Sequence, residues 1–178
     1  RGELTLRGKT YKVNGTHVRD RSWGANRSEM HAPSPPIDWM TGVFNDNFAF
    51  SITAYDHPDT NPEWKDFLPV PGGDPTKGGW IYRDGQLIPI VSVVKRGGHN
   101  FSTLAPTDVE MTVTDANGRS YDIRGTVTVA NRFGFWPTMD TYICLARWEC
   151  EGMVCHGDLQ QVQWHDYIRR FLNNPPVR

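Results

Sequence analysis

The sequence predicts an all-β domain: an antiparallel barrel of about nine or ten strands, followed by a short C-terminal helix. Residues that favour turns divide the 178-residue chain at regular intervals. Between them, apolar and polar residues alternate with the period of two that is typical of half-buried strands. Segments with helical periodicity do not separate the strands, as a parallel α/β fold would require.

The first half of the chain contains three expected hairpins. The pattern predicts strands at 4–6 and 11–13, at 39–44 and 48–55, and at 79–83 and 87–95. Asp84-Gly85 joins the third pair, and such a dipeptide supplies the positive φ angles of a tight turn. Two segments rich in Pro, Gly and Asp, 25–36 and 57–77, are expected to be long loops, either functional lids or plain surface.

The second half continues the same pattern. Asn117-Gly118 separates expected strands at 109–115 and 119–129, and Glu151-Gly152 separates strands at 140–150 and 153–163. Residues 164–173 have helical spacing and end before two prolines. Because most strands are joined to their neighbours in the sequence, the expected topology is an up-and-down barrel.

The composition is that of an ordinary globular domain, with 38% hydrophobic and 22% charged residues. A net charge of −1 gives no electrostatic footprint for nucleic acid, and no apolar run is long enough for a transmembrane segment. The three cysteines are expected to be reduced, which favours a cytoplasmic protein. Residues 1–178 are expected to form one domain. The chain begins inside a strand pattern, which favours the interpretation that it is a piece of a longer protein.

The densest cluster of charge lies at 17–24. If this segment is a strand, cations and an aromatic ring share one face, and a carboxylate lies on the other: His17, Arg19, Arg21 and Trp23 against Val18, Asp20 and Ser22. The first face suits a polarised or anionic group. The alternative is an Arg–Asp ion-pair network that braces the barrel mouth.

A second cluster lies in the last hairpin, with Trp148 between charged neighbours and Asp158 after His156-Gly157. The best candidates for a general acid are the carboxyl groups of Asp20, Asp38, Glu149 and Asp158. A carboxyl in an apolar pocket has a raised pKa, as a general acid needs.

Several kinds of chemistry have no motif in this chain. A Gly-x-Ser-x-Gly elbow, a Walker loop and a Gly-x-Gly-x-x-Gly element are all missing from the sequence. The spacing of Cys150, Cys155 and His156 fits no ordinary zinc pattern. The sequence therefore predicts no metal and no cofactor.

The segment Arg19-Asp20-Arg21-Ser22-Trp23-Gly24 resembles the Arg-Asp-His-Ser-Trp-Gly signature of proteins similar to hydroxyneurosporene synthase (carotenoid 1,2-hydratase). Residues 79–85 and the closing strand at 152–163 also resemble that superfamily. The resemblance covers most of the chain and implies a lipocalin-like (calycin-type) barrel, the second of a pair.

The resemblance also implies a hydrophobic, terpenoid-like substrate. In the hydratases an acid protonates an alkene and water captures the cation, while related cyclases act mainly by shaping the substrate. Asp20 and Trp23 match the signature, but Arg21 replaces the usual histidine and cannot exchange protons near neutrality. As a fixed positive charge, Arg21 would instead hold a carboxylate or stabilise an enolate.

The leading hypothesis is a cofactor-independent lyase or isomerase, hydratase- or cyclase-like, for a terpenoid- or polyketide-like molecule of secondary metabolism. The expected catalytic residues are Asp20, Arg21 and Asp158. The expected substrate-binding residues are Arg19, Trp23, Asp38, Trp39, Phe50 and Trp148. The alternatives are a non-catalytic lipid- or terpenoid-binding barrel, or the structural half of a two-barrel enzyme whose partner is a preceding barrel or a second copy.

Overall fold

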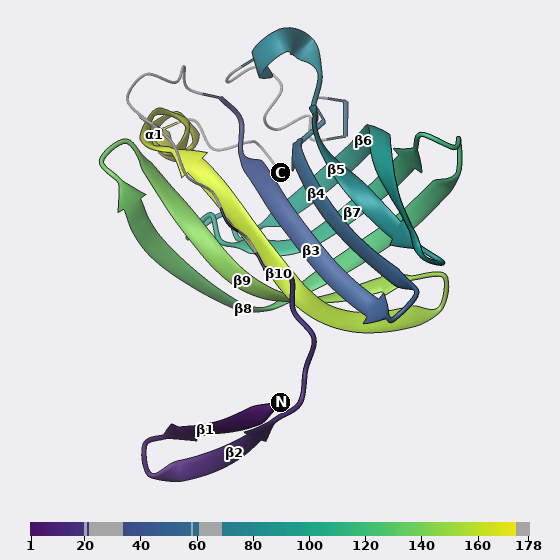
Figure 1. The fold of residues 1–178 in the computed structure, drawn as a ribbon. Helices are drawn as coiled ribbons and strands as arrows, with labels where there is room; N and C mark the ends of the chain where they lie inside the picture. The colour runs from purple at the N-terminus through teal and green to yellow at the C-terminus, as the bar shows by residue number, and fades with distance from the viewer. Residues whose placement is uncertain (20, 22–33, 58, 61–68, 174–178) are drawn as a thin grey trace.

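A computed structural model describes residues 1–19, 21, 34–57, 59–60 and 69–173. Eight strands form a closed antiparallel barrel in the order β10-β3-β4-β5-β6-β7-β8-β9 (Figure 1). These strands are β3 (Ile37–Asn45), β4 (Phe48–Tyr55), β5 (Thr76–Arg83), β6 (Gln86–His99), β7 (Pro106–Asp115), β8 (Ser120–Trp136), β9 (Met139–Cys150) and β10 (Met153–Trp164). A short 3₁₀ turn at Pro71–Gly73 precedes β5. Each strand pairs with its sequence neighbours, and β10 closes the barrel against β3, which confirms the up-and-down topology.

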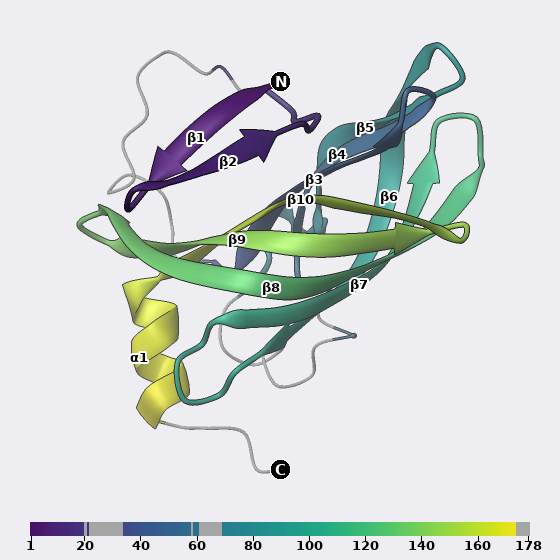
Figure 2. The same cartoon turned by 90° about the horizontal axis from the view of Figure 1, so that it is seen from below.

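The barrel has eight strands, fewer than the predicted nine or ten. The remaining two, β1 (Gly2–Leu6) and β2 (Lys9–Val13), form a separate two-stranded hairpin. The views in Figures 1 and 2 both place this hairpin apart from the barrel. All ten of its residues are exposed, so the sequence pattern of a hairpin was correct but its inclusion in the barrel was not.

Tight turns join the strands at one end of the barrel, as their sequences predict. Asp84 and Gly85 have φ angles of 50° and 83°, and Glu151 and Gly152 have 50° and 75°. Two consecutive positive φ angles match the right-handed twist of the flanking strands, and glycine adopts such an angle without steric strain.

The same end, called here the closed end, is filled by aromatic side chains. Phe50 and Trp148 are fully buried and meet edge to face, with ring centroids 5.3 Å apart. The Arg83 guanidinium lies 4.4 Å from the centre of the Phe48 ring and donates to Glu151 at 2.9 Å. Apolar packing and a charged turn together close this end of the barrel.

The opposite end, called the mouth, is flanked by α1 (His165–Asn173), which lies beside the end of β10 and is close to the predicted helix at 164–173 (Figure 1). Tyr167 and Phe171 lie one turn apart and are buried on the same helix face. Phe171 stacks on Phe101 of the β6–β7 loop, with centroids 5.7 Å apart. This small apolar cluster fixes the helix across the end of β10.

Candidate functional site

Three charged side chains are buried together inside the barrel. Lys95 on β6 donates from Nζ to Oδ2 of Asp38 on β3 and to Oδ1 of Asp56, just after β4. The exposed fraction is 0% for Lys95 and Asp38 and 2% for Asp56. A single buried charge is strongly unfavourable, so these three residues can remain inside only as a group.

The charges of this group do not balance if all three are ionised, because two carboxylates face one ammonium. Burial by itself would lower the pKa of Lys95, but the attraction of Asp38 and Asp56 raises it to about 12. The pKa of Asp38 is raised, chiefly because burial disfavours its carboxylate and also because Asp56 is near; Lys95 opposes this shift. The environment of the cluster therefore favours the protonated form of Asp38 more than water does, and it favours the charged form of Lys95.

A chain of hydrogen bonds with a fixed direction lies between this cluster and the mouth. The carbonyl oxygen of Leu104 can only accept, so Nε2 of Gln163, 2.8 Å away, donates to it. The same Nε2 donates to Oε1 of Gln161 at 2.6 Å. Oε1 of Gln161 also lies 2.8 Å from Nε2 of His99, which must therefore carry a proton and donate. The Leu104 carbonyl thus sets the orientation of both amides.

Strand register explains why these groups meet. Gln161 on β10 lies opposite Asp38 on β3 and opposite Tyr142 on β9. Paired residues of neighbouring antiparallel strands share a face, and here that face is the barrel interior. Gln163, two residues further along β10, lies on the same face and nearer the mouth.

A pocket of about 510 Å³ opens at the mouth beside this chain. Its lining combines apolar side chains with a few polar ones: Ser102, Thr103, Leu104, Ala105, Ala130, Arg132, Tyr142, Gln163, Ile168 and Leu172. At its rim, Arg132 donates to Asp140, and Nε2 of His165 lies 3.5 Å from the same carboxylate. A concave surface that combines apolar side chains with convergent polar groups suits a small molecule.

Three buried polar atoms at this end lack a hydrogen-bond partner among the described residues: Oδ1 of Asp38, Nε2 of Gln161 and Oε1 of Gln163. The Gln161 amide is nevertheless close enough to lower the pKa of Asp38. Buried polar atoms are normally paired, since leaving one unpaired costs about 1–3 kcal/mol. Oδ1 of Asp38 and Nε2 of Gln161 are an acceptor and a donor on paired residues, so Oε1 of Gln163 is the atom of this path that remains without a partner among the described residues.

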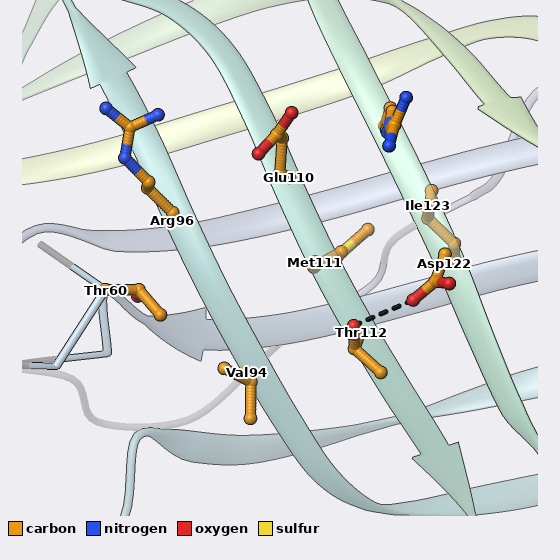
Figure 3. A pocket seen from close by; sticks show the side chains of 9 residues that line it. Thr60, Val94, Arg96, Glu110, Met111, Thr112, Asp122 and Ile123 are labelled. Atoms are coloured by element: carbon orange, nitrogen blue, oxygen red, sulfur yellow. Dashed lines mark hydrogen bonds between the residues drawn. The ribbon is translucent and has the colours of Figure 1, made fainter.

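A second pocket, of about 350 Å³, lies on the outer face of β6, β7 and β8 (Figure 3). Arg96, Glu110 and Arg124 are cross-strand neighbours there, and Thr112 donates to Asp122 at 2.8 Å. These five side chains are exposed and alternate in charge, as expected of a solvated sheet face. The mouth is therefore the better candidate site.

The structure places three of the predicted site residues inside the barrel. Asp38 belongs to the buried charged cluster at the mouth side, whereas Phe50 and Trp148 belong to the aromatic core of the closed end. The indole N–H of Trp148 has no partner among the described residues. Asp38 is therefore separated from Phe50 and Trp148, with which it was predicted to form one substrate-binding site.

Two other predicted residues lie on the outer face of the barrel. Trp39 donates to Ser51 at 3.1 Å, and Asp158 lies 3.0 Å from Nε2 of His17. Their strand neighbours on either side point inward, so alternation turns Trp39 and Asp158 outward.

The remaining predicted residues come from the charged segment 17–24. Arg19 and Arg21 are exposed, while Asp20 and Trp23 lie outside the described residues. Residues 17–19 and 21 are not in a strand, so the shared strand face expected for this segment is not formed by the described residues. A high local density of charge favours exposed backbone over a half-buried strand.

Sequence reasoning missed Lys95, Asp56, Gln161 and His99. A usable signal was present in the alternation of the strands. Asp56 lies an even number of residues after inward-facing Phe48 and Phe50, and Lys95 lies two residues after buried Val93. Alternation therefore places both side chains on the interior face. A charged residue at a core position of an apolar strand is a candidate functional residue, since it needs a buried partner.

The three cysteines are buried free thiols. Burial raises the pKa of Cys144 to about 12 and the pKa values of Cys150 and Cys155 to about 11. Within the described residues, no group of three or more His, Cys, Asp or Glu side chains is arranged to hold a metal ion.

Comparison with known families gives a match over most of the chain. The chain matches the family described as Domain of unknown function (DUF7064) over residues 1–167. The chain belongs to this family. Comparison with curated proteins and with solved structures returned no match. In the part of the DUF7064 chain that the structure describes, no helix has the length and apolar character needed to cross a bilayer.

Proposed function

We propose that this DUF7064 barrel is a cofactor-independent lyase or isomerase for a hydrophobic small molecule that enters at the mouth. The buried charged cluster carries the proposal. Asp38 has a raised pKa, and the Lys95 ammonium and the Gln161 amide lie beside its carboxyl group. Asp38 does not itself line the mouth pocket, but Gln161, opposite it on β10, is hydrogen-bonded to Gln163, which does. Perturbed carboxyl groups near a pocket are typical of acid–base sites.

In this proposal Asp38 is the proton donor. Its carboxyl proton is transferred to one carbon of a substrate double bond, whose electron pair forms the new C–H bond. The cation that remains loses a different proton to the Asp38 carboxylate, which gives an isomer, or is captured by water, which gives an alcohol after loss of a proton. Lys95 holds Asp56 as its counter-ion and positions the Asp38 carboxyl.

The resemblance to carotenoid hydratases agrees with this chemistry at a coarse level. It assigns the acid to Asp20 or Asp158, whereas we assign it to Asp38. Asp158 faces the outer surface and contacts His17, away from the mouth pocket. A role for Arg21 and for Asp20 in the same reaction remains a prediction from the signature.

Incubation in D₂O with a panel of terpenoid alkenes tests the proposal. The wild-type chain should incorporate deuterium into at least one alkene, as measured by mass spectrometry. Asp38→Asn should lower the rate by about 100-fold or more, the usual size of a general acid's contribution. Asp122→Asn, an exposed change on the outer face, should leave the rate unchanged. Equal rates for wild type and Asp38→Asn would refute the assignment.

A non-catalytic binding barrel is the second candidate, favoured by the mouth pocket of about 510 Å³, which Asp38 does not line. Native mass spectrometry of protein purified from its host separates the two functions. A bound lipid or terpenoid that is recovered unchanged, together with no deuterium incorporation, supports the carrier. A released product that differs from the added alkene supports the enzyme.

A further inference from the structure

We propose that the mouth pocket binds a hydrophobic alcohol, whose hydroxyl group donates a hydrogen bond to Oε1 of Gln163. This inference rests on the proposed function, because it names the class of molecule that the same site accepts. Gln163 lines the pocket, and its side chain is only 1% exposed. Its Oε1 has no partner among the described residues.

The orientation of the Gln163 amide is fixed, which makes the free atom an acceptor and not a donor. Nε2 already donates to the Leu104 carbonyl and to Gln161 Oε1. Rotating the amide by 180° would bring Oε1 against these two acceptors. The ligand must therefore supply a donor, such as a hydroxyl hydrogen, to this position.

The other polar groups at the pocket argue against an anionic ligand. Asp140 accepts from the Arg132 guanidinium and offsets its charge, and the Tyr142 hydroxyl already donates to the Thr103 carbonyl. A carboxylate would add acceptor oxygens beside the unpaired oxygen of Gln163 and would leave that oxygen unpaired. A neutral hydroxyl satisfies it without any new charge.

The rest of the pocket suits the apolar part of such a molecule. Leu104 and Ala105 of the β6–β7 loop lie on its lining together with Ile168 and Leu172 of α1. These side chains offer no hydrogen bond and match an alkyl or terpenoid chain. A buried acceptor beside these apolar side chains is an arrangement that recognises an amphipathic alcohol.

Isothermal titration calorimetry with three probes of matched length tests this inference on the full chain. The probes are n-decanol, methyl nonyl ether and decanoate. The wild-type chain should bind the alcohol at least about tenfold more tightly than the ether, because the ether leaves the acceptor unpaired. Decanoate should bind more weakly than the alcohol.

Gln163→Met keeps the length of the side chain but removes the acceptor, so its affinities for alcohol and ether should become equal. Gln160→Met, on the outward-facing side of the same strand, should keep the tenfold preference. Equal wild-type affinities for alcohol and ether, tighter binding of decanoate, or no binding of any probe would overturn the inference. The wild-type comparison decides the matter even if Gln163→Met does not fold.

The two proposals fail in different ways. An alcohol preference without Asp38-dependent deuterium incorporation supports the pocket and rejects the enzyme. Deuterium incorporation that depends on Asp38, without an alcohol preference, supports the enzyme and rejects the alcohol.

Discussion

Replacing Lys95 by Met removes the only cation that the described residues place between Asp38 and Asp56, while keeping most of the apolar side-chain volume. The substitution removes the two charge-assisted hydrogen bonds of Lys95, each worth about 1.5–3 kcal/mol. It also removes the counter-ion that the described residues supply to these buried carboxyl groups. We therefore expect a loss of about 3–5 kcal/mol in the free energy of unfolding near neutral pH.

For a chain of this length, that loss lowers Tm by about 6–20 °C. Urea unfolding followed by tryptophan fluorescence measures the free energy, and calorimetry measures Tm. The loss should be smaller at about pH 4 than at about pH 8, because protonated carboxyls need no cation. Lys12→Met, at an exposed position in the β1–β2 hairpin, is the matched control and should change stability by less than about 0.5 kcal/mol.

Two results would contradict this account of the cluster. A loss below about 1 kcal/mol would mean that the three charges are not held as a buried group. An equal loss at acidic and alkaline pH would mean that Lys95 acts through packing and not through its charge.

Three further outcomes follow from the same structure. The pKa of Asp38 in the folded chain is raised above the ordinary value of 3.8, so the stability that Asp38 contributes is present below pH 3.8 and is lost as the pH rises through its folded-state pKa. The free energy of unfolding of the wild type in urea, relative to that of Asp38→Asn, should therefore fall with increasing pH. Gly157→Ala should lower the free energy of unfolding in urea by about 1–3 kcal/mol, since the new Cβ would lie 2.0 Å from the Thr41 carbonyl oxygen. Gly2→Ala is the control, because its Cβ would lie in open space and should have little effect. Equal effects of the two substitutions would disprove the close approach. The three buried cysteines should react with a thiol reagent at about pH 8 far more slowly in the native chain than in urea, and equally fast labelling would show that they are accessible.

Local signals in the sequence predicted most of the fold. Turns such as Asp84-Gly85 and Glu151-Gly152 require backbone angles that few residue pairs adopt, so they mark hairpins without knowledge of the rest of the chain. The predicted size of the barrel was wrong because β1 and β2 have the same alternation as the barrel strands. Alternation shows that a strand has an apolar face but not which surface covers that face.

The candidate site was predicted only in part for a similar reason. Asp38 was selected, but its partners Lys95 and Asp56 were not, because a charge within a strand usually points to solvent. The three residues are brought together by barrel closure, a long-range event with no local signature. The charged segment 17–24 attracted attention by its density of charge, yet Arg19 and Arg21 are exposed.

The pairing of β3 with β10 has a consequence for how the chain folds during synthesis. The barrel begins at Ile37 and closes only with the strand that ends at Trp164. A nascent chain that lacks β10 presents two open sheet edges, on β3 and β9, and open edges promote pairing with other chains. It also lacks Gln161 and Gln163, so the hydrogen-bond chain forms last. The proposed site is therefore assembled by the same step that ends the period when the chain is most prone to aggregate.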